Sequence, residues 1–122
     1  VTSAGYTAVE KELTAAFNEE EEIKAIFVTN SRVFLVAQYL ERSRKRDILL
    51  IGYDFIEKNI EYLKKDVIDI LICHRPGEQG YQGLMKLYQH FILGKTFENI
   101  SFMPIDILTK ENYEFYNNYM SV

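Results

Sequence analysis

The chain has 122 residues, of which 48% are hydrophobic and 26% charged, and its formal net charge is −4. This length suits one domain or part of one, and the composition excludes a disordered protein. The negative charge makes the chain a poor nucleic-acid binder by itself, and no hydrophobic run approaches the roughly 20 residues that cross a bilayer. The single cysteine, Cys73, excludes an internal disulfide and fits the reducing cytoplasm. Because the chain starts at Val1 and shows no signal peptide, we expect a fragment of a longer cytoplasmic protein.

The chain is predicted to alternate helices with strands. Apolar residues recur every three or four positions in the helical segments, and the strand segments are short runs rich in Ile, Val and Leu. Asn30 or Ser31 is expected to cap the second helix, and Gly52 allows backbone or ligand to approach the second strand closely. The predicted helices cover residues 5–20, 31–44, 56–64, 76–93 and 110–119, and the predicted strands cover residues 24–29, 47–53, 67–73 and 102–108.

This alternation with short connections predicts an α/β fold. We expect a three-layer sandwich in which a parallel, doubly wound sheet has helices on both faces. Pro104 interrupts the last strand, so residues 102–108 are predicted to form an edge strand or a crossing segment. Only three strands are predicted to be central, which indicates a partial lobe that lacks strands on its N-terminal side.

Polar residues follow each of the three central strands at the point where the strand ends. Asn30 follows the first strand, Asp54 the second, and His74 and Arg75 the third. The carboxyl ends of parallel strands meet at one edge of a sheet, and ligands of open α/β proteins bind there. The sequence therefore predicts a small-molecule site formed by Asn30, Asp54, His74 and Arg75.

The chemistry of these residues suits a ligand rich in hydroxyl groups. The Asp54 carboxylate accepts hydrogen bonds and the Asn30 amide both accepts and donates, so together they can pair with adjacent hydroxyls. His74 can donate or accept. Arg75 is expected to point to the opposite side of the strand from His74, and it can clamp a carboxylate or phosphate where it faces the site. A structural alternative also exists for each, namely a helix cap for Asn30 and Asp54 and a bond to the next turn for His74.

Three motifs occur in a fixed order along the chain. They are Ala25-Ile26-Phe27-Val28-Thr29-Asn30, then Leu50-Ile51-Gly52-Tyr53-Asp54, then Ile72-Cys73-His74-Arg75-Pro76 with Gln79-Gly80-Tyr81 after it. In this order they resemble the C-terminal lobe of the effector-binding domain in the lac repressor family, which shares its fold with type I periplasmic sugar-binding proteins. Two positions depart from the family pattern. Ser31 stands where the family usually has Asp, and His74 stands where it often has Gln, so the choice of sugar is expected to differ.

The resemblance implies a function for residues 1–122 as a single-domain fragment of that lobe. A small sugar-like effector would bind between two lobes, and closure would move DNA-binding arms. Operator DNA would be contacted only through a helix-turn-helix that this chain lacks. The alternative is a sugar-binding protein that serves a transporter or a sensor. Tyr6, Tyr53 and Phe55 are candidates for a stacking ring, although a position in the core or the wall is favoured for each.

Phe34, Leu35 and Tyr39 lie off the apolar stripe of the second helix. The resemblance implies that this helix contributes to a homodimer contact. The alternative is that these side chains cover another part of the same chain.

Catalytic and metal-binding functions have less support in the sequence. Cys73 and His74 are adjacent, so their side chains diverge on a strand and do not form a nucleophile–base pair. The usual spacings of metal ligands and a phosphate-binding glycine loop are both missing. We therefore expect no enzyme activity, no metal and no cofactor. An enzyme domain built on a nucleotide-binding α/β sheet is the third alternative, after the regulator and the sugar-binding protein.

Overall fold

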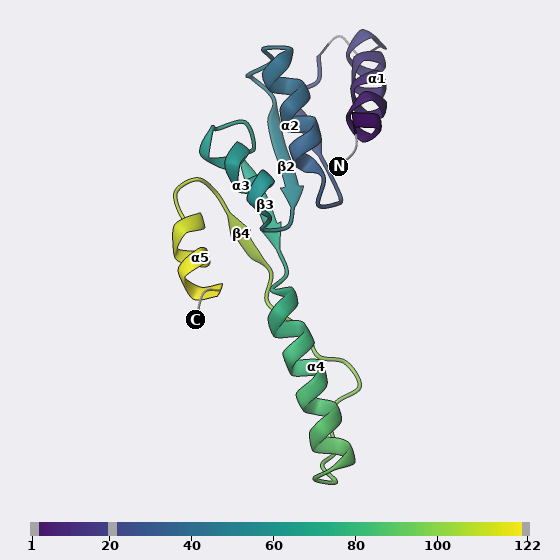
Figure 1. Ribbon diagram of the computed structural model, residues 1–122, viewed down its shortest axis with the longest axis vertical. Coiled ribbons are helices and arrows are strands. Elements are labelled where there is room, and N and C mark those ends of the chain that lie inside the picture. The colour runs from purple at the N-terminus through teal and green to yellow at the C-terminus, as the bar shows by residue number, and fades with distance from the viewer. Residues whose placement is uncertain (1–2, 20–21, 121–122) are drawn as a thin grey trace. The chain divides into compact units, whose positions relative to one another are not determined.

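The structure is a computed structural model that describes residues 3–19 and 22–120. Helices and strands follow one another in the predicted order (Figure 1). Most predicted ends agree within three residues, and Glu20, predicted to end the first helix, lies outside the described residues. The elements are α1 (Ser3–Glu19), β1 (Ala25–Phe27), α2 (Val33–Arg42), β2 (Leu49–Tyr53), α3 (Glu57–Lys64), β3 (Ile70–Cys73), α4 (Pro76–Phe91), β4 (Asp106–Leu108) and α5 (Tyr113–Met120).

The chain divides into two compact units. The sheet unit contains the residues up to Ile72 and those from Ile107 onward, and the α4 unit contains Cys73–Asp106. The prediction that residues 1–122 form one lobe of a larger domain stays a prediction.

Four strands form one sheet in the order β1-β2-β3-β4. Strand β2 is parallel to both of its neighbours, with Leu50 opposite Ile26 and Gly52 opposite Leu71. The α/β class and the parallel pairing of the first three strands are therefore confirmed. Strand β4 lies at the edge, as Pro104 predicted, but it runs in the opposite direction (Figure 1). The sheet is therefore mostly parallel, and β4 runs against its neighbour because the chain returns to the sheet through the extended segment 101–105.

Helix α2 forms much of the core because it lies directly on β2. Its first residue, Val33, is fully buried, and a Cβ built on Gly52 would lie only 2.4 Å from the Val33 side chain. A residue without a side chain is therefore required at position 52. Gly52 allows a close approach, as the sequence predicted, and the group that approaches is helix α2 rather than a ligand.

The off-stripe residues of α2 are buried within this chain. Phe34, Leu35 and Tyr39 are 6%, 3% and 7% exposed. The Tyr39 ring stacks on Phe17 of α1 with 6.0 Å between ring centroids, and its hydroxyl lies 3.3 Å from that of Thr14. These contacts support the second alternative, in which the side chains cover another part of the same chain. A role in a contact between two copies stays a prediction.

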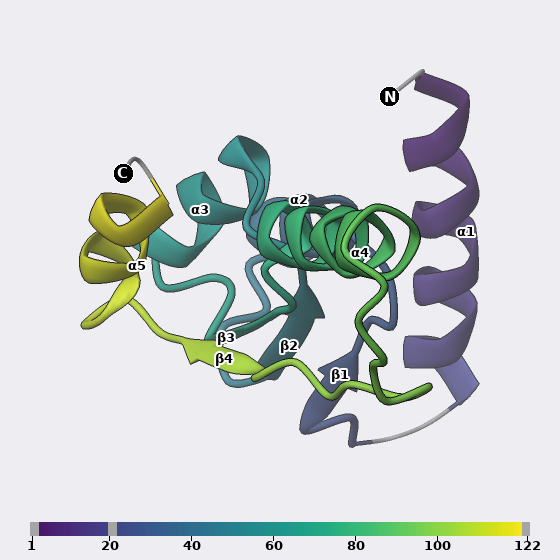
Figure 2. The ribbon, with the colours of Figure 1, turned by 90° about the horizontal axis from the view of Figure 1, so that it is seen from below.

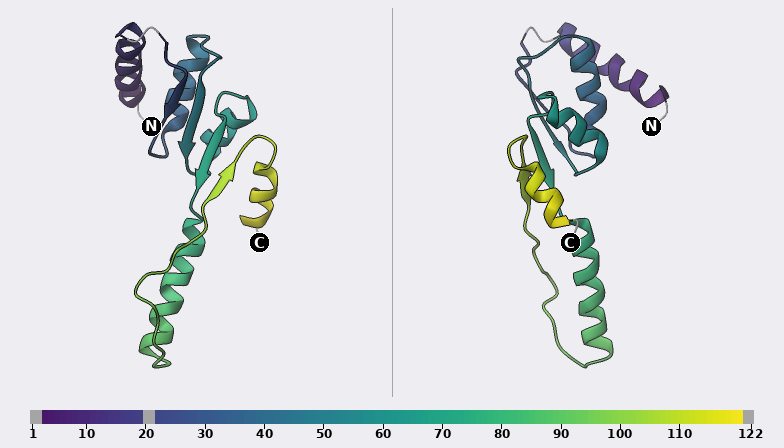
Figure 3. Two further views of the ribbon diagram at one scale, coloured as in Figure 1. Left: turned by 180° about the vertical axis from the view of Figure 1, so that it is seen from behind. Right: turned by 60° about the vertical axis from the view of Figure 1, so that its left-hand side comes forward.

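The helices of the sheet unit cover one face of the sheet. Figures 2 and 3 show α2 and α3 on the same side of the strands, with α1 beside α2. Leu50 and Leu71 are fully buried on that side, whereas Phe27 and Leu49 are 54% and 43% exposed. The second helical layer of the predicted sandwich is not seen over the other face within the described part of the sheet unit.

An ion pair joins the two ends of the α4 unit. Arg75 donates from Nε and Nη2 to the two carboxylate oxygens of Asp106, at 2.6 and 2.8 Å, and from Nη1 to Glu78 at 3.4 Å. The side chains of Arg75 and Asp106 are only 22% and 20% exposed, and this two-bonded geometry is the strongest that arginine makes with a carboxylate. The pair joins positions 75 and 106, whereas α4 between them has no buried residue.

Among the described residues, none of the helices is both long and apolar enough to cross a membrane.

Replacing Gly52 by Ala is expected to destabilise the sheet unit. The added methyl group overlaps the buried Val33 side chain, so α2 must move away from β2, at a cost of about 1–3 kcal/mol. Gly80→Ala is the control, since an added Cβ at position 80 meets nothing within 4 Å and Ala favours a helix. Urea unfolding would measure both variants, and equal stabilities would contradict the close packing.

The Arg75–Asp106 pair predicts a loss of stability in acid. The Arg75 guanidinium holds the pKa of Asp106 below its ordinary value, so the unfolded chain takes up a proton first as the pH falls. The contribution of the pair is complete above about pH 5 and disappears as the pH falls through the lowered pKa of the folded state. Asp106→Asn should cost about 1 kcal/mol at pH 7 and progressively less below pH 4.

Urea unfolding between pH 7 and pH 3 would test this prediction. Glu98→Gln, which alters an exposed carboxylate in the same unit, is the matched control. A difference between native protein and Asp106→Asn that stays constant with pH would contradict the role given to the pair.

Candidate functional site

The carboxyl ends of β1 and β2 carry two of the predicted site residues. Asn30 lies in the loop between β1 and α2, and Asp54 directly follows β2. Because the two strands are parallel neighbours, both loops leave the sheet at the same edge. We call this pair of loops the rim, meaning residues 28–32 and 54–56.

Asn30 is exposed, and its side chain shapes its own loop. Its Oδ1 accepts a hydrogen bond from the backbone N–H of Arg32 at 2.8 Å, which is a turn typical of Asn. The prediction that Asn30 or Ser31 caps α2 is therefore wrong. Arg32 occupies the N-cap of α2, and no side chain of its own caps the helix there.

Asp54 has an unusual backbone conformation. Its φ is +74°, a left-handed conformation that Asp and Asn adopt more readily than most residues. Its N–H donates to the carbonyl of Ile72 at 3.0 Å, which extends the pairing of β2 with β3 by one residue. This hydrogen bond holds the backbone of Asp54 in place. Because the residue is partly exposed, its carboxylate has access to solvent.

A buried side chain that the sequence analysis missed connects the two rim loops. Asn59 of α3 is fully buried. Its Oδ1 accepts from the N–H of Phe34 at 3.2 Å, and its Nδ2 lies 3.1, 2.9 and 3.1 Å from the carbonyl oxygens of Ser31, Tyr53 and Asp54. Asn59 thus caps the N-terminus of α2 from another helix, because the N-cap residue Arg32 does not. The available signal was an Asn four residues before Leu63, on the apolar side of α3.

His74 and Arg75 lie in the α4 unit. Strand β3 ends at Cys73 and Arg75 has a φ of +51°, so the strand alternation used to predict their directions does not extend to them. The carbonyl of His74 accepts from Gln79 Nε2 at 2.6 Å, which is a bond to the next turn. The Arg75 guanidinium contacts Asp106 and Glu78. Contact of either side chain with a ligand stays a prediction.

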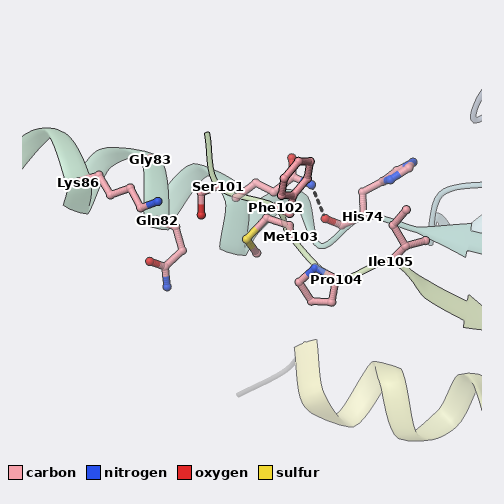
Figure 4. A pocket seen from close by; sticks show the side chains of 10 residues that line it. His74, Gln82, Gly83, Lys86, Ser101, Phe102, Met103, Pro104 and Ile105 are labelled. Atoms are coloured by element: carbon pink, nitrogen blue, oxygen red, sulfur yellow. Dashed lines mark hydrogen bonds between the residues drawn. The ribbon is translucent and has the colours of Figure 1, made fainter. Parts of the chain in front are cut away.

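His74 also borders a cavity within the α4 unit. The cavity has a volume of about 430 Å³ and lies between α4 and the return segment 101–105 (Figure 4). Gln82 and Lys86 reach it from the helix, and Ser101 and Met103 from the return segment. This volume lies within the usual range of small-molecule pockets.

The candidate stacking rings all contact other rings or cations. An Arg42 guanidinium lies 4.8 Å from the Tyr6 ring centroid, Tyr53 packs on Phe27 at 5.7 Å between centroids, and Phe55 packs edge-on against Tyr116 at 4.8 Å. These contacts favour wall or core positions.

The described residues hold no group of three or more His, Cys, Asp or Glu side chains placed to bind a metal ion. Cys73 is buried and not in a disulfide. The polar side chains of the rim include the Asp54 carboxylate and the Asn30 amide, which can form hydrogen bonds.

Comparison with known proteins identifies the family. Residues 2–96 match the periplasmic binding protein domain. A comparison with curated protein sequences finds no match.

Solved structures of two kinds resemble the chain. A protein from Bacteroides fragilis assigned as a LacI transcriptional regulator is 37% identical, with a TM-score of 0.82, over 88% of this chain and 37% of its own. A glucose-galactose binding protein from Geobacillus stearothermophilus is 20% identical, with a TM-score of 0.76, over 84% of this chain and 37% of its own. A carbohydrate transporter solute binding protein from Agrobacterium radiobacter, in complex with D-arabinose, is 20% identical, with a TM-score of 0.78, over 94% and 39%.

The chain thus spans less than two fifths of these proteins. The family and the matched structures are binding proteins and regulators rather than enzymes, in agreement with the prediction of no catalytic role. The predicted fold class is also confirmed, since the chain has an α/β architecture that matches part of a periplasmic-binding-protein-like fold. With its family match covering residues 2–96, the chain belongs to the periplasmic binding protein domain family.

Proposed function

We propose that this chain forms one wall of the effector site in a LacI-type transcriptional regulator. The identity of 37% with the Bacteroides fragilis regulator, over 88% of the chain, carries the proposal. The sugar-transport binding proteins of the same fold are 18–20% identical. In such a regulator the chain acts in the cytoplasm, as part of a homodimer, and operator DNA is bound by another part of the protein.

The proposed effector is a sugar or a sugar derivative. Structures of the same fold hold D-tagatose, D-arabinose and D-allose. The Asp54 carboxylate at the rim accepts hydrogen bonds from hydroxyls, and the Asn30 amide group can donate to them. Because the chain spans 37% of the regulator's length, the opposite wall of the site belongs to the rest of such a protein, and closure on the sugar would change the DNA affinity.

The second candidate function is a sugar-binding protein of a transporter or a sensor. It is supported by the structural likeness to transport binding proteins, with TM-scores of 0.77–0.79. Both functions use the same rim, so the response of DNA binding to sugar separates them.

A sugar that binds the intact protein is expected to raise its melting temperature. At a concentration 100 times its Kd, the sugar stabilises the folded state by about 2.7 kcal/mol. Asp54→Asn keeps a residue that tolerates the left-handed backbone and removes the charge, so it should weaken binding about 10- to 100-fold. A thermal-shift screen with D-arabinose, D-allose and D-tagatose, followed by calorimetry, gives both values.

Asp47→Asn is the matched control for this experiment. Asp47 is exposed and precedes β2, at the edge of the sheet opposite the rim. Its replacement should leave the affinity unchanged. A sugar that binds Asp54→Asn as tightly as it binds the native protein would place the site elsewhere.

The regulator function predicts sugar-dependent DNA binding. The intact protein should bind the DNA upstream of its own gene in a mobility-shift assay, and the sugar from the screen should change that affinity about fivefold or more. Sugar binding without any DNA binding would reject the regulator and support the transport or sensor protein.

A further inference from the structure

The buried amide of Asn59 connects both rim loops at once. Ser31 and Phe34 lie where the first loop joins α2, and their backbone groups contact the amide at 3.1 and 3.2 Å. On the other side the amide contacts the carbonyl of Tyr53, the last residue of β2, and that of Asp54, the first residue of the second loop. One side chain therefore bridges the loop that carries Asn30 and the loop that carries Asp54.

The Asn59 amide satisfies both sides of this bridge, and a carboxylate would not. The first turn of α2 presents the N–H of Phe34, which needs an acceptor, and the carbonyls of both loops need a donor. Asn supplies an acceptor oxygen and an NH₂ group, whereas the carboxylate of Asp supplies acceptors alone. The side chain is too short to follow one loop while the other stays in place.

Burial makes the bridge costly to break. Asn59 is 0% exposed, so water cannot replace a partner that moves away. A buried N–H or carbonyl left without a partner is strongly disfavoured. The two loops are therefore expected to move together, which keeps the distance between Asn30 and Asp54 constant.

We propose that Asn59 is a positioning residue for the ligand site. It sets the spacing of Asn30 and Asp54, and it controls the affinity for the ligand although its burial excludes contact with the ligand itself. This inference rests on the proposed sugar site at the rim.

Asn59→Asp in the intact protein tests the proposal. The new carboxylate can still accept from Phe34, but it places a negative oxygen against the carbonyls of Ser31 and Tyr53. We expect the affinity for the sugar identified among D-arabinose, D-allose and D-tagatose to fall tenfold or more. Circular dichroism would confirm that the variant is folded at the temperature of the binding assay.

Asn112→Asp is the matched control. Asn112 also bridges backbone groups, since its Oδ1 accepts from the N–H of Thr109 at 2.8 Å and its Nδ2 donates to the carbonyl of Ile107 at 3.0 Å. It lies after β4, outside the rim. The same change of chemistry should lower stability there without altering the sugar affinity by more than twofold. Equal losses of affinity in both variants would overturn the positioning role.

Hydrogen–deuterium exchange without sugar gives a second measurement. In Asn59→Asp, peptides covering residues 30–36 and 53–57 should both exchange faster, because both loops lose the bridge. Faster exchange in only one peptide would overturn the proposal. This readout does not depend on ligand, so a native protein that binds no sugar would contradict the proposed function and leave the loop coupling testable.

Asn59→Ser replaces the first variant if Asn59→Asp does not fold. The Ser hydroxyl donates one hydrogen bond and can accept two, but it lies on a shorter side chain. It therefore weakens the bridge without adding a buried charge and should give a smaller loss of affinity. A sugar affinity equal to that of the native protein in Asn59→Ser would also overturn the proposal.

Discussion

The close approach of α2 to β2 at Gly52 is the constraint on which the arrangement of the rim depends. Val33 fills the space that a side chain at position 52 would occupy, so the first turn of α2 lies against the end of β2. This contact brings the N–H of Phe34 within reach of Asn59 on α3. Packing between a helix and a strand therefore determines where the two rim loops lie, and the buried amide then joins them.

The polar residues at the ends of the strands make structural contacts, whatever they contribute to the proposed binding site. Asn30 uses its oxygen to form a turn with Arg32, and Arg75 uses its guanidinium to bind Asp106. Asp54 differs from both, because its backbone is fixed by hydrogen bonds while its carboxylate is half-exposed. For this reason Asp54 is the residue at which a ligand contact is best tested.

The α4 unit depends on a different kind of interaction. Its helix presents apolar residues to solvent, and Leu84 and Phe91 are 67% and 75% exposed. Within the unit, the charge-assisted pair of Arg75 and Asp106 closes the segment at its two ends. Stability of this segment is therefore expected to respond to acid, whereas that of the sheet unit depends mainly on buried apolar surface.

The sequence by itself determined the order and type of the helices and strands, because hydrophobic periodicity and turn residues are local signals. It also placed Asn30 and Asp54 at the ends of neighbouring strands and identified the close approach at Gly52. Only the tertiary structure decided which partners polar groups have. The Arg75–Asp106 pair joins positions 31 residues apart, and Asn59 meets backbone groups of two loops. The direction of β4 and the covered face of the sheet were also decided at this level, since the strands are apolar on both faces and local sequence does not specify which face a helix will cover.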